Sequence, residues 1–560
     1  MKLARLWTQD CLNNHDTCRE GHVSGANKFL PTRLIDVRDP GRPFLRTTSD
    51  APAIPPGVKY IALSYAWGEG ERVVTTKENI QSHGHQIPTG NLPQTFADAF
   101  ETTRLLEYQD IWVDAFCIAQ NDKDDLSNEL PHMGDIYRFA EFTIFAEGAA
   151  NAGAGLFQAR DPYLYRPCTL DVKATTEHDT ISETLTLTTR CTGPNYLKSR
   201  GWILQEEILT SKSLIFGKQL AWKCTTSEAS EMKPCPQPRR SVLREGQMTG
   251  EDRLRLWIYA PDRMRSAQRK NWFRWNHYDA WYAVLEAYSS RELSFDSDRL
   301  PALSGLADLF QRAHSSTYAA GLWQEDLQVG LAWYVASNDR RPAKKDRAQA
   351  PSWSWASVGM VRLRYRSWRA NSSHEVESGA KILDVSCELE NELNPYGRVE
   401  KGTLKIHTRI KKGMLRCSSR YMTNRTEHIY GSYSGPDSAT MTKGESPRFP
   451  ALVYDMDSPD VIGEVALDAP IHTCLEPGID DKDFLTDEGE ERGISFKTGI
   501  WCAILHVQKS GDVLRGTALV SERVQTEPPT YRRLGLMFIK EHSESNSSLF
   551  SWKDEIMEIY

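Results

Sequence analysis

Apolar and polar residues follow two different periods along this chain, and the change from one to the other predicts a mixed α/β fold. Continuous apolar runs at residues 60–65 and 111–113 are typical of buried strands. Between them, apolar residues recur at helical spacing after the segment 91–93, which predicts a helix that starts near Gln94. A strand, a helix and a second strand in this order predict a parallel sheet with a right-handed crossover.

A second helical pattern and a third strand continue this arrangement. Apolar residues recur every three or four positions between 126 and 140, and Pro131 interrupts them, so we expect a helix that is kinked there or begins late. The apolar run at 142–146 predicts the third strand. The small-residue loop at 148–155 follows it without the glycine pattern of a phosphate-binding loop.

Shorter segments of the first half are expected to add strands and connections. Residues 31–37 predict an edge strand that is entered from a proline. An alternating stretch at 184–189 predicts a hairpin inserted between residues 160 and 200, and residues 213–224 predict another hairpin. The polar, proline-containing segment 225–264 is expected to be a linker or a surface loop.

The second half of the chain changes from helical to strand periodicity. Residues 271–335 have a helical pattern, whereas alternating segments nearer the C-terminus predict a β-sandwich or barrel-like domain. These segments are residues 404–410, 461–467, 500–507, 514–521 and 534–540. We therefore expect four regions: an N-terminal approach segment (1–50), an α/β domain (51–235), a helical region packed on that domain (236–360) and a β-rich domain of unknown role (361–560).

Composition argues against several classes of protein. The formal net charge is −7 and the sequence pI is about 6.1, so no global positive field exists to hold nucleic acid or an anionic membrane. No apolar run approaches the roughly 20 residues needed to cross a bilayer, and the first residues lack the apolar core of a signal peptide. The 11 cysteines are odd in number and scattered, which indicates reduced thiols. We expect a cytoplasmic protein with no nucleic-acid partner and no membrane span.

Four residues near the N-terminus have the side chains of a zinc site. Cys11, His15, Cys18 and His22 form a C-x3-H-x2-C-x3-H pattern, and a structural zinc ion takes four such ligands. The spacing matches no common zinc module, and a short helix with incidental thiols also explains the pattern. The sequence leaves both interpretations open, and we assign no metal from it.

Polar residues follow the apolar strands of the α/β domain, where open α/β sheets place their ligands. Asp114 comes directly after the second strand, and a third segment, residues 200–209, supplies Glu206. These two carboxylates are the candidate catalytic residues. The candidate ligand-binding residues are Tyr65, Trp67, Gly68, Gln120, Arg200, Trp202 and Gln205.

Three motifs in this region are specific enough to indicate a family. The stretches ALSYAWG at 62–68, WVDAFCIAQ at 112–120 and RGWILQE at 200–206 stand in the order found in the HET domain of fungal heterokaryon-incompatibility proteins, which the chain resembles. Ala115 and Phe116 replace the Ser and Leu of many members. The resemblance implies a role in fungal non-self recognition (allorecognition), with the HET module as the part that triggers programmed cell death.

A more distant resemblance bears on mechanism. HET domains look similar to TIR domains, which implies a TIR/flavodoxin-like parallel sheet, here with inserted hairpins and followed by the helical region and the β-rich domain. Some TIR domains cleave NAD+ with a glutamate four residues after a tryptophan. Glu206 stands at that spacing from Trp202, although Ile203 occupies the position of the family's cysteine.

The cluster of polar residues supports two opposed interpretations. In one, Glu206 holds ribose hydroxyls, Trp67 or Trp202 stacks on a base, Asp114 adds a carboxylate and Arg200 pairs with phosphate. In the other, Arg200, Glu206 and Asp114 form a buried ionic group that fixes the end of the sheet, and Trp67 is core.

Three functional hypotheses follow. The first is a self-associating effector that needs a protein partner or a second copy and no cofactor. The second is an enzyme that hydrolyses NAD+ as its substrate. The third is a divergent HET relative without lethal activity.

Overall fold

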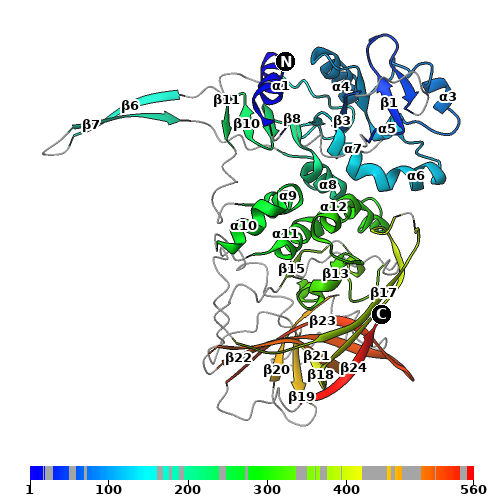
Figure 1. Ribbon diagram of the computed structural model, residues 1–560, viewed down its shortest axis with the longest axis vertical. Helices are drawn as coiled ribbons and strands as arrows, with labels where there is room; N and C mark the ends of the chain where they lie inside the picture. Colours follow the sequence, from blue (N-terminus) through cyan, green and yellow to red (C-terminus); the bar gives the residue numbers. More distant parts are fainter. Residues whose placement is uncertain are drawn as a thin grey trace, which may run out of the picture. The chain divides into compact units, whose positions relative to one another are not determined.

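The chain forms two compact units, whose helices and strands are shown in Figure 1. The first unit comprises residues 1–255, 291–293 and 301–306, and the second comprises residues 256–290, 294–300 and 307–560. The computed structural model describes residues 1–16, 18, 29–48, 58–68, 72–159, 168–175, 180–187, 194–238, 248–270, 275–335, 350–359, 361–365, 375–392, 394–418, 451–455, 461–468, 494–510, 513–542 and 552–560.

A parallel core lies at the centre of the nine-stranded sheet of the first unit. Its strands are β3 (Tyr60–Ser64), β4 (Asp110–Trp112), β5 (Thr143–Phe145) and β8 (Lys212–Phe216), in the spatial order β8-β5-β3-β4. All three pairings between them are parallel. Every strand of this core is therefore followed by a loop or helix at the same edge of the sheet.

Antiparallel strands extend the sheet on both sides. Beyond β4 lie β1 (Arg33–Asp36) and β2 (Phe44–Thr47), and beyond β8 lie β9 (Leu220–Cys224), β10 (Ser227–Ser230) and β11 (Lys233–Pro238). The prediction of a hairpin over residues 213–224 is confirmed by the antiparallel pairing of β8 with β9.

Two sequence predictions about these flanking strands are wrong. β1 is not an edge strand, because β2 pairs with its outer side. The Arg33 side chain of β1 also makes hydrogen bonds within the domain: it donates to the Cys117 carbonyl at 2.7 Å and to Asp125 at 2.5 Å. The described part of residues 225–264 is not a linker, because it forms β10, β11 and two helices. The prolines that suggested a loop are tolerated in β11, because β11 is the last strand of the sheet and its outer side has no neighbouring strand among the described residues to accept hydrogen bonds.

The helices of the first unit follow the predicted periodicity. α4 (Gln94–Leu105) begins at the expected residue. The second predicted helix is divided into α6 (Lys123–Glu129) and α7 (Met133–Phe139) by a 3-10 turn that contains Pro131. The third motif folds as α8 (Gly201–Leu209), which packs against α7. Shorter or terminal helices are α1 (Lys2–Asn14), α3 (Ile80–His83) and α5 (Asp114–Cys117).

The predicted inserted hairpin is also present. β6 (Cys168–Thr175) and β7 (Thr180–Leu187) pair antiparallel as a separate two-stranded sheet, drawn at the left of Figure 1. The end of the alternating stretch, residues 188–189, lies outside the described residues.

The second unit combines helices with a large sheet in which every described strand pairing is antiparallel except that of β23 (Pro529–His542) with β24 (Lys553–Ile559). α9 (Gly250–Tyr259) crosses the boundary between the units, and α10 (Pro261–Arg269) and α11 (His277–Ser289) follow it. α11 starts with a capping box, in which Asn276 and Asp279 each accept the other's backbone N–H. The remaining short elements between residues 296 and 365 are η5 (Asp296–Asp298), η6 (Pro301–Leu303), α12 (Ser304–His314), β12 (Tyr318–Ala319), β13 (Leu322–Trp323), η7 (Gln324–Asp326), α13 (Leu327–Gly330), β14 (Trp333–Val335), η8 (Trp355–Ser357) and β15 (Leu363–Tyr365), of which η6 and the start of α12 belong to the first unit.

The predicted β-rich C-terminal region is confirmed, and six of its strands close on themselves. The ring runs β18-β21-β22-β23-β20-β19 and returns to β18. Apolar side chains from these strands, among them Leu415, Ile504 and Met537, form its core. The strands of this sheet are β16 (Glu375–Gly379), β17 (Lys381–Leu389), β18 (Val399–Ser418), β19 (Ala451–Asp455), β20 (Val461–Leu467), β21 (Ile494–Ser510), β22 (Val513–Thr526), β23 (Pro529–His542) and β24 (Lys553–Ile559).

Across the described residues, none of the helices has both the length and the apolar character needed to span a membrane.

Candidate functional site

The three motifs meet at the carboxyl ends of β3 and β4. The chain leaving β3 places Tyr65 and Trp67 there, and Asp114 is the first residue of the turn after β4. The Trp67 indole N–H donates to Asp114 Oδ2 at 3.1 Å. Arg200, at the start of α8, donates from Nη1 to the Tyr65 carbonyl at 2.6 Å. Segments far apart in the sequence are thus joined by direct hydrogen bonds.

Both carboxylate oxygens of Asp114 are hydrogen-bonded within the protein. Oδ1 accepts from the backbone N–H of Ala115 at 2.7 Å, and Oδ2 accepts from Trp67. Burial raises the pKa of Asp114, and the Tyr65 hydroxyl and the positive charge of Arg200 oppose that rise. Gln120 donates to the Asp114 carbonyl at 2.9 Å. Asp114 and Gln120 therefore hold the turn after β4 together.

Glu206 is the carboxyl group of the cluster with an unsatisfied atom. It is 5% exposed, and its Oε2 has no hydrogen-bond partner among the described residues. Burial raises the pKa of Glu206 to about 7, the negative charge of Asp114 adds to the rise, and Ser64, Arg200 and Tyr137 oppose it. Near neutral pH this side chain is poised between the protonated and ionised states, as a general acid or base would be.

The other predicted ligand-binding residues have structural partners. Gln205 Oε1 accepts from the backbone N–H groups of Gly305 at 2.8 Å and Leu306 at 3.3 Å. Trp202 packs against the apolar core of the sheet. Gly68 has a φ of +74°, and a Cβ there would lie 2.2 Å from Asn151 Cβ. Glycine is needed at this position because Asn151 of the loop 148–155 packs directly against it.

Three residues of the cluster were not predicted as site residues. Ser64 and Tyr137 lie beside Glu206, and the Arg72 guanidinium lies over the Trp67 ring, 4.9 Å from its centroid. Tyr137 lies within the helical apolar pattern of residues 126–140, which on its own indicates a core position. The signal that distinguishes it is its hydroxyl, which a buried core position does not require and which donates to the Leu63 carbonyl at 3.3 Å.

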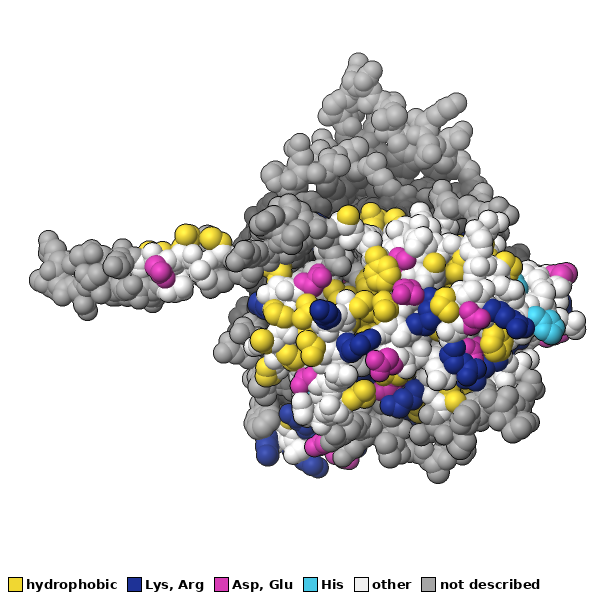
Figure 2. Space-filling view, turned by 90° about the horizontal axis from the view of Figure 1, so that it is seen from above, with side chains coloured by type: hydrophobic (Ala, Val, Ile, Leu, Met, Phe, Trp, Pro, Cys, Tyr) yellow, Lys and Arg dark blue, Asp and Glu magenta, His cyan; other side chains and the backbone are white. Residues whose placement is uncertain are grey.

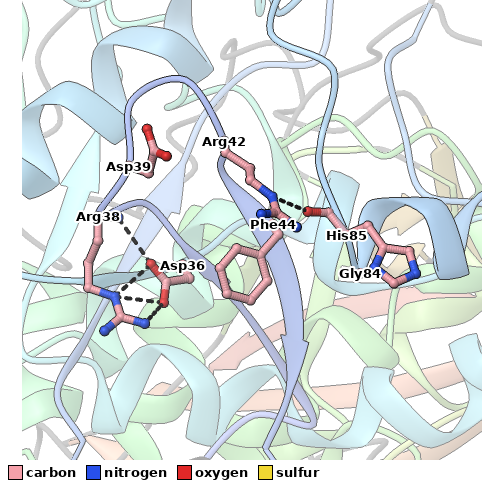
Figure 3. A pocket seen from close by; sticks show the side chains of 7 residues that line it. All are labelled: Asp36, Arg38, Asp39, Arg42, Phe44, Gly84 and His85. Atoms are coloured by element: carbon pink, nitrogen blue, oxygen red, sulfur yellow. Dashed lines mark hydrogen bonds and ion pairs between the residues drawn. The ribbon is translucent and has the colours of Figure 1, made fainter.

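A cavity of about 390 Å³ lies away from this cluster, at β1 and β2 (Figure 3). Its lining residues are Asp36, Arg38, Asp39, Arg42, Phe44, Gly84 and His85. Asp36 accepts from Arg38 Nε at 2.9 Å, and Arg42 donates to the His85 carbonyl at 3.2 Å, as the dashed lines show. These charged groups already have partners, so we assign the cavity no ligand.

Three of the four candidate zinc ligands from the sequence pattern are brought together in the structure, and a more distant cysteine joins them. Cys11, His15 and Cys18 lie together, and Cys224 at the end of β9 joins them. His22 lies outside the described residues.

Together the sheet and its bonded polar cluster define an α/β domain with a parallel centre. Residues 60–206 of this domain match the family model of the heterokaryon incompatibility protein (HET). The chain therefore carries a HET domain, which confirms the resemblance of its three motifs. A search of curated proteins found no match, and neither did a search of solved structures.

Proposed function

We propose that this protein is an effector of fungal non-self recognition, in which the HET domain triggers programmed cell death by self-association in the cytoplasm. The internal bonding of the motif residues supports this proposal. Asp114 accepts from Trp67, Arg200 donates to the Tyr65 carbonyl, and Gln205 accepts from backbone N–H groups, so these residues stabilise the domain without needing a ligand. A rigid module that acts by assembly fits this arrangement.

The β6–β7 hairpin is the surface that we assign to self-association. Leu170 lies directly opposite Leu185, and Val172 follows on the same face, because alternate residues of a strand share a face. These side chains are 45%, 45% and 41% exposed. In Figure 2 apolar side chains gather along one side of this hairpin.

We infer that this apolar face of the β6–β7 hairpin binds the same face of the hairpin in a second copy of the protein. Neither strand pairs with another strand among the described residues, and an isolated two-stranded hairpin is marginally stable in water. Two copies that stack their Leu170 faces would bury these side chains in an isologous contact. The opposite face is polar: Thr184 donates to Asp171 at 2.7 Å.

Sedimentation or light scattering of the purified protein tests this assignment. We expect the wild type to form dimers or larger species and the double variant Leu170→Lys/Leu185→Lys to be monomeric. Thr184→Lys adds a lysine on the polar face and is the matched control, for which we expect wild-type assembly. A monomeric wild type at all concentrations, or assembly that survives the double variant, would remove the hairpin from the proposal.

A specific observation favours a second candidate function, TIR-like NAD+ glycohydrolysis. Glu206 has an unsatisfied buried oxygen and a pKa raised to about 7, beside Asp114 and Arg200. Numbered along the chain, the parallel core has the strand order 2-1-3-4, which is that of flavodoxin-like sheets. Such a carboxylate would hold ribose hydroxyls while the bond to nicotinamide breaks. Because Glu206 is only 5% exposed, a substrate would reach it only after the loops above it move.

Release of nicotinamide from NAD+ distinguishes the two functions. The assembly proposal predicts no turnover by the wild type in monomeric or assembled form. Turnover that is lost in Glu206→Gln would establish the enzyme, and turnover unchanged by that variant would place the catalytic group elsewhere. The third hypothesis, a HET relative without lethal activity, predicts that expression in a fungal host leaves viability unchanged.

A further inference from the structure

Four metal-ligating side chains converge beside the N-terminal helix, outside the polar cluster of the HET motifs. The Sγ atoms of Cys11, Cys18 and Cys224 and a ring nitrogen of His15 all lie within 4.8 Å of one another. The three thiols are buried, and His15 is partly buried. We propose that these residues form a structural Zn²⁺ site with three cysteine ligands and one histidine ligand.

The distances agree with a tetrahedral centre. With Zn–S bonds near 2.3 Å and Zn–N bonds near 2.0 Å, two ligand sulfurs lie about 3.8 Å apart and a sulfur and a nitrogen about 3.5 Å apart. His15 Nδ1 and Cys224 Sγ are 3.5 Å apart. A disulfide would join two of the sulfurs and leave the third thiol and the imidazole without a role, whereas a metal uses all four.

The local backbone explains why these side chains face one another. Cys11 is on the buried face of α1, which also presents Ala4, Trp7 and Thr8 to the protein. The chain turns immediately afterwards, with the His15 N–H donating to the Cys11 carbonyl at 3.2 Å and the Cys18 N–H to the His15 carbonyl at 3.1 Å. Two short turns therefore bring three ligands to one side.

The fourth ligand comes from a β-turn 209 residues after His15. Cys224 ends β9, and the backbone N–H of Ser227, at the start of β10, donates to its sulfur at 3.2 Å. Thr226 Oγ1 lies 3.6 Å from Cys18 Sγ. Hydrogen-bond donors around the sulfurs stabilise the negative charge that three thiolates bring to a zinc ion.

The donor set identifies the ion and its role. Thiolates with an imidazole in tetrahedral array select zinc over calcium or magnesium, which prefer oxygen ligands. Four protein ligands leave no open position, so the ion would be structural and not catalytic. It would fasten α1 to the β9–β10 turn, and the Trp7 indole of α1 also donates to the Pro234 carbonyl of β11 in the same sheet, at 2.7 Å.

Metal analysis of the full-length protein, purified without chelator, tests the site. We expect about one zinc per chain, and at least a tenfold lower zinc content in Cys224→Ser. Cys235→Ser is the matched control, because Cys235 is an exposed thiol of β11 in the same sheet, and it should keep its zinc.

A second measurement does not depend on the folding of any variant. Wild-type protein stripped with chelator and reloaded with Co²⁺ should show the visible bands and sulfur-to-metal charge transfer of a tetrahedral thiolate site, and added Zn²⁺ should abolish them. Absence of both zinc and the cobalt spectrum, zinc retained in Cys224→Ser, or a disulfide between two of the three cysteines in the purified protein would each overturn the proposal.

Discussion

The carboxyl group of Glu206 differs from the other polar groups of the HET motifs. Asp114 has both oxygens bonded, whereas Glu206 Oε2 is buried without a partner among the described residues. A buried, incompletely satisfied carboxyl group is costly to ionise. In the folded protein Glu206 therefore keeps its proton to a higher pH than in the unfolded chain.

We predict that Glu206→Gln makes the stability of the HET domain less dependent on pH. The pKa of Glu206 rises from 4.5 to about 7 on folding, so the folded state binds the proton more tightly and the free energy of unfolding falls as pH rises through this interval. Glutamine has no proton to lose. Urea titrations should give the variant a relative gain of roughly 2–3 kcal/mol between pH 5 and pH 8. A constant difference between variant and wild type across this range would contradict the raised pKa.

For individual residues, the sequence predicted which side chains lie together at the sheet edge but not which partner each one contacts. The position of Asp114 and Trp67 after adjacent parallel strands was enough to place them at one edge. The role of Gln205 depends on the N–H groups of residues 305 and 306, which the chain reaches only after another hundred residues. Cys224 was missed as a partner of Cys11 for the same reason, since a local spacing pattern contains no information about distant strands.

Helix α7 approaches the returning segment 301–306 through two glycines. A Cβ on Gly134 would lie 2.7 Å from the Gly305 Cα and 3.1 Å from Leu209 Cδ1. Both neighbours belong to packed elements, so backbone atoms must move to admit a methyl group.

We therefore predict that Gly134→Ala destabilises the first unit by about 1–3 kcal/mol, despite the better helix propensity of alanine. Gly90→Ala is the control, because a Cβ at Gly90 meets nothing within 4 Å. The free energy of unfolding from urea titration measures both. Equal stability of the two variants would show that α7 and segment 301–306 are not packed as described.

The sequence predicted individual helices and hairpins better than it predicted which strands lie next to one another in the sheet. Periodicity was sufficient for α4, for the break at Pro131 and for the hairpins, because each depends on residues close in sequence. It was insufficient for β1, whose outer partner β2 is set by the long-range sheet. It also failed for residues 225–264, where prolines suggested a linker but occupy an edge strand.

For the molecule as a whole, a buried arginine is among the residues that join the helical and β-rich parts of the second unit. Arg533 in β23 pairs with Asp468 at 2.8 Å and donates to the carbonyls of Leu331 at 2.7 Å and Trp333 at 2.5 Å. Its guanidinium also lies 3.4 Å from the centroid of the Trp333 ring.

We predict that Arg533→Met destabilises the second unit by roughly 3–5 kcal/mol, because it leaves the buried Asp468 without its partner. The adjacent Arg532→Met is the matched control. Arg532 is 55% exposed and pairs with Glu522 at the surface, so its loss should cost less than about 1 kcal/mol. Chemical unfolding followed by tryptophan fluorescence measures both. A similar small effect for the two variants would mean that Arg533 does not join these parts.

The viability of fungal cells that express the full-length protein tests the central claim, that the HET domain acts by assembly. At equal protein levels, we expect the wild type and Glu206→Gln to kill the cells, and Leu170→Lys/Leu185→Lys to leave them viable. Survival with Glu206→Gln, together with killing by the hairpin variant, would contradict this account and favour catalysis by the buried carboxyl group.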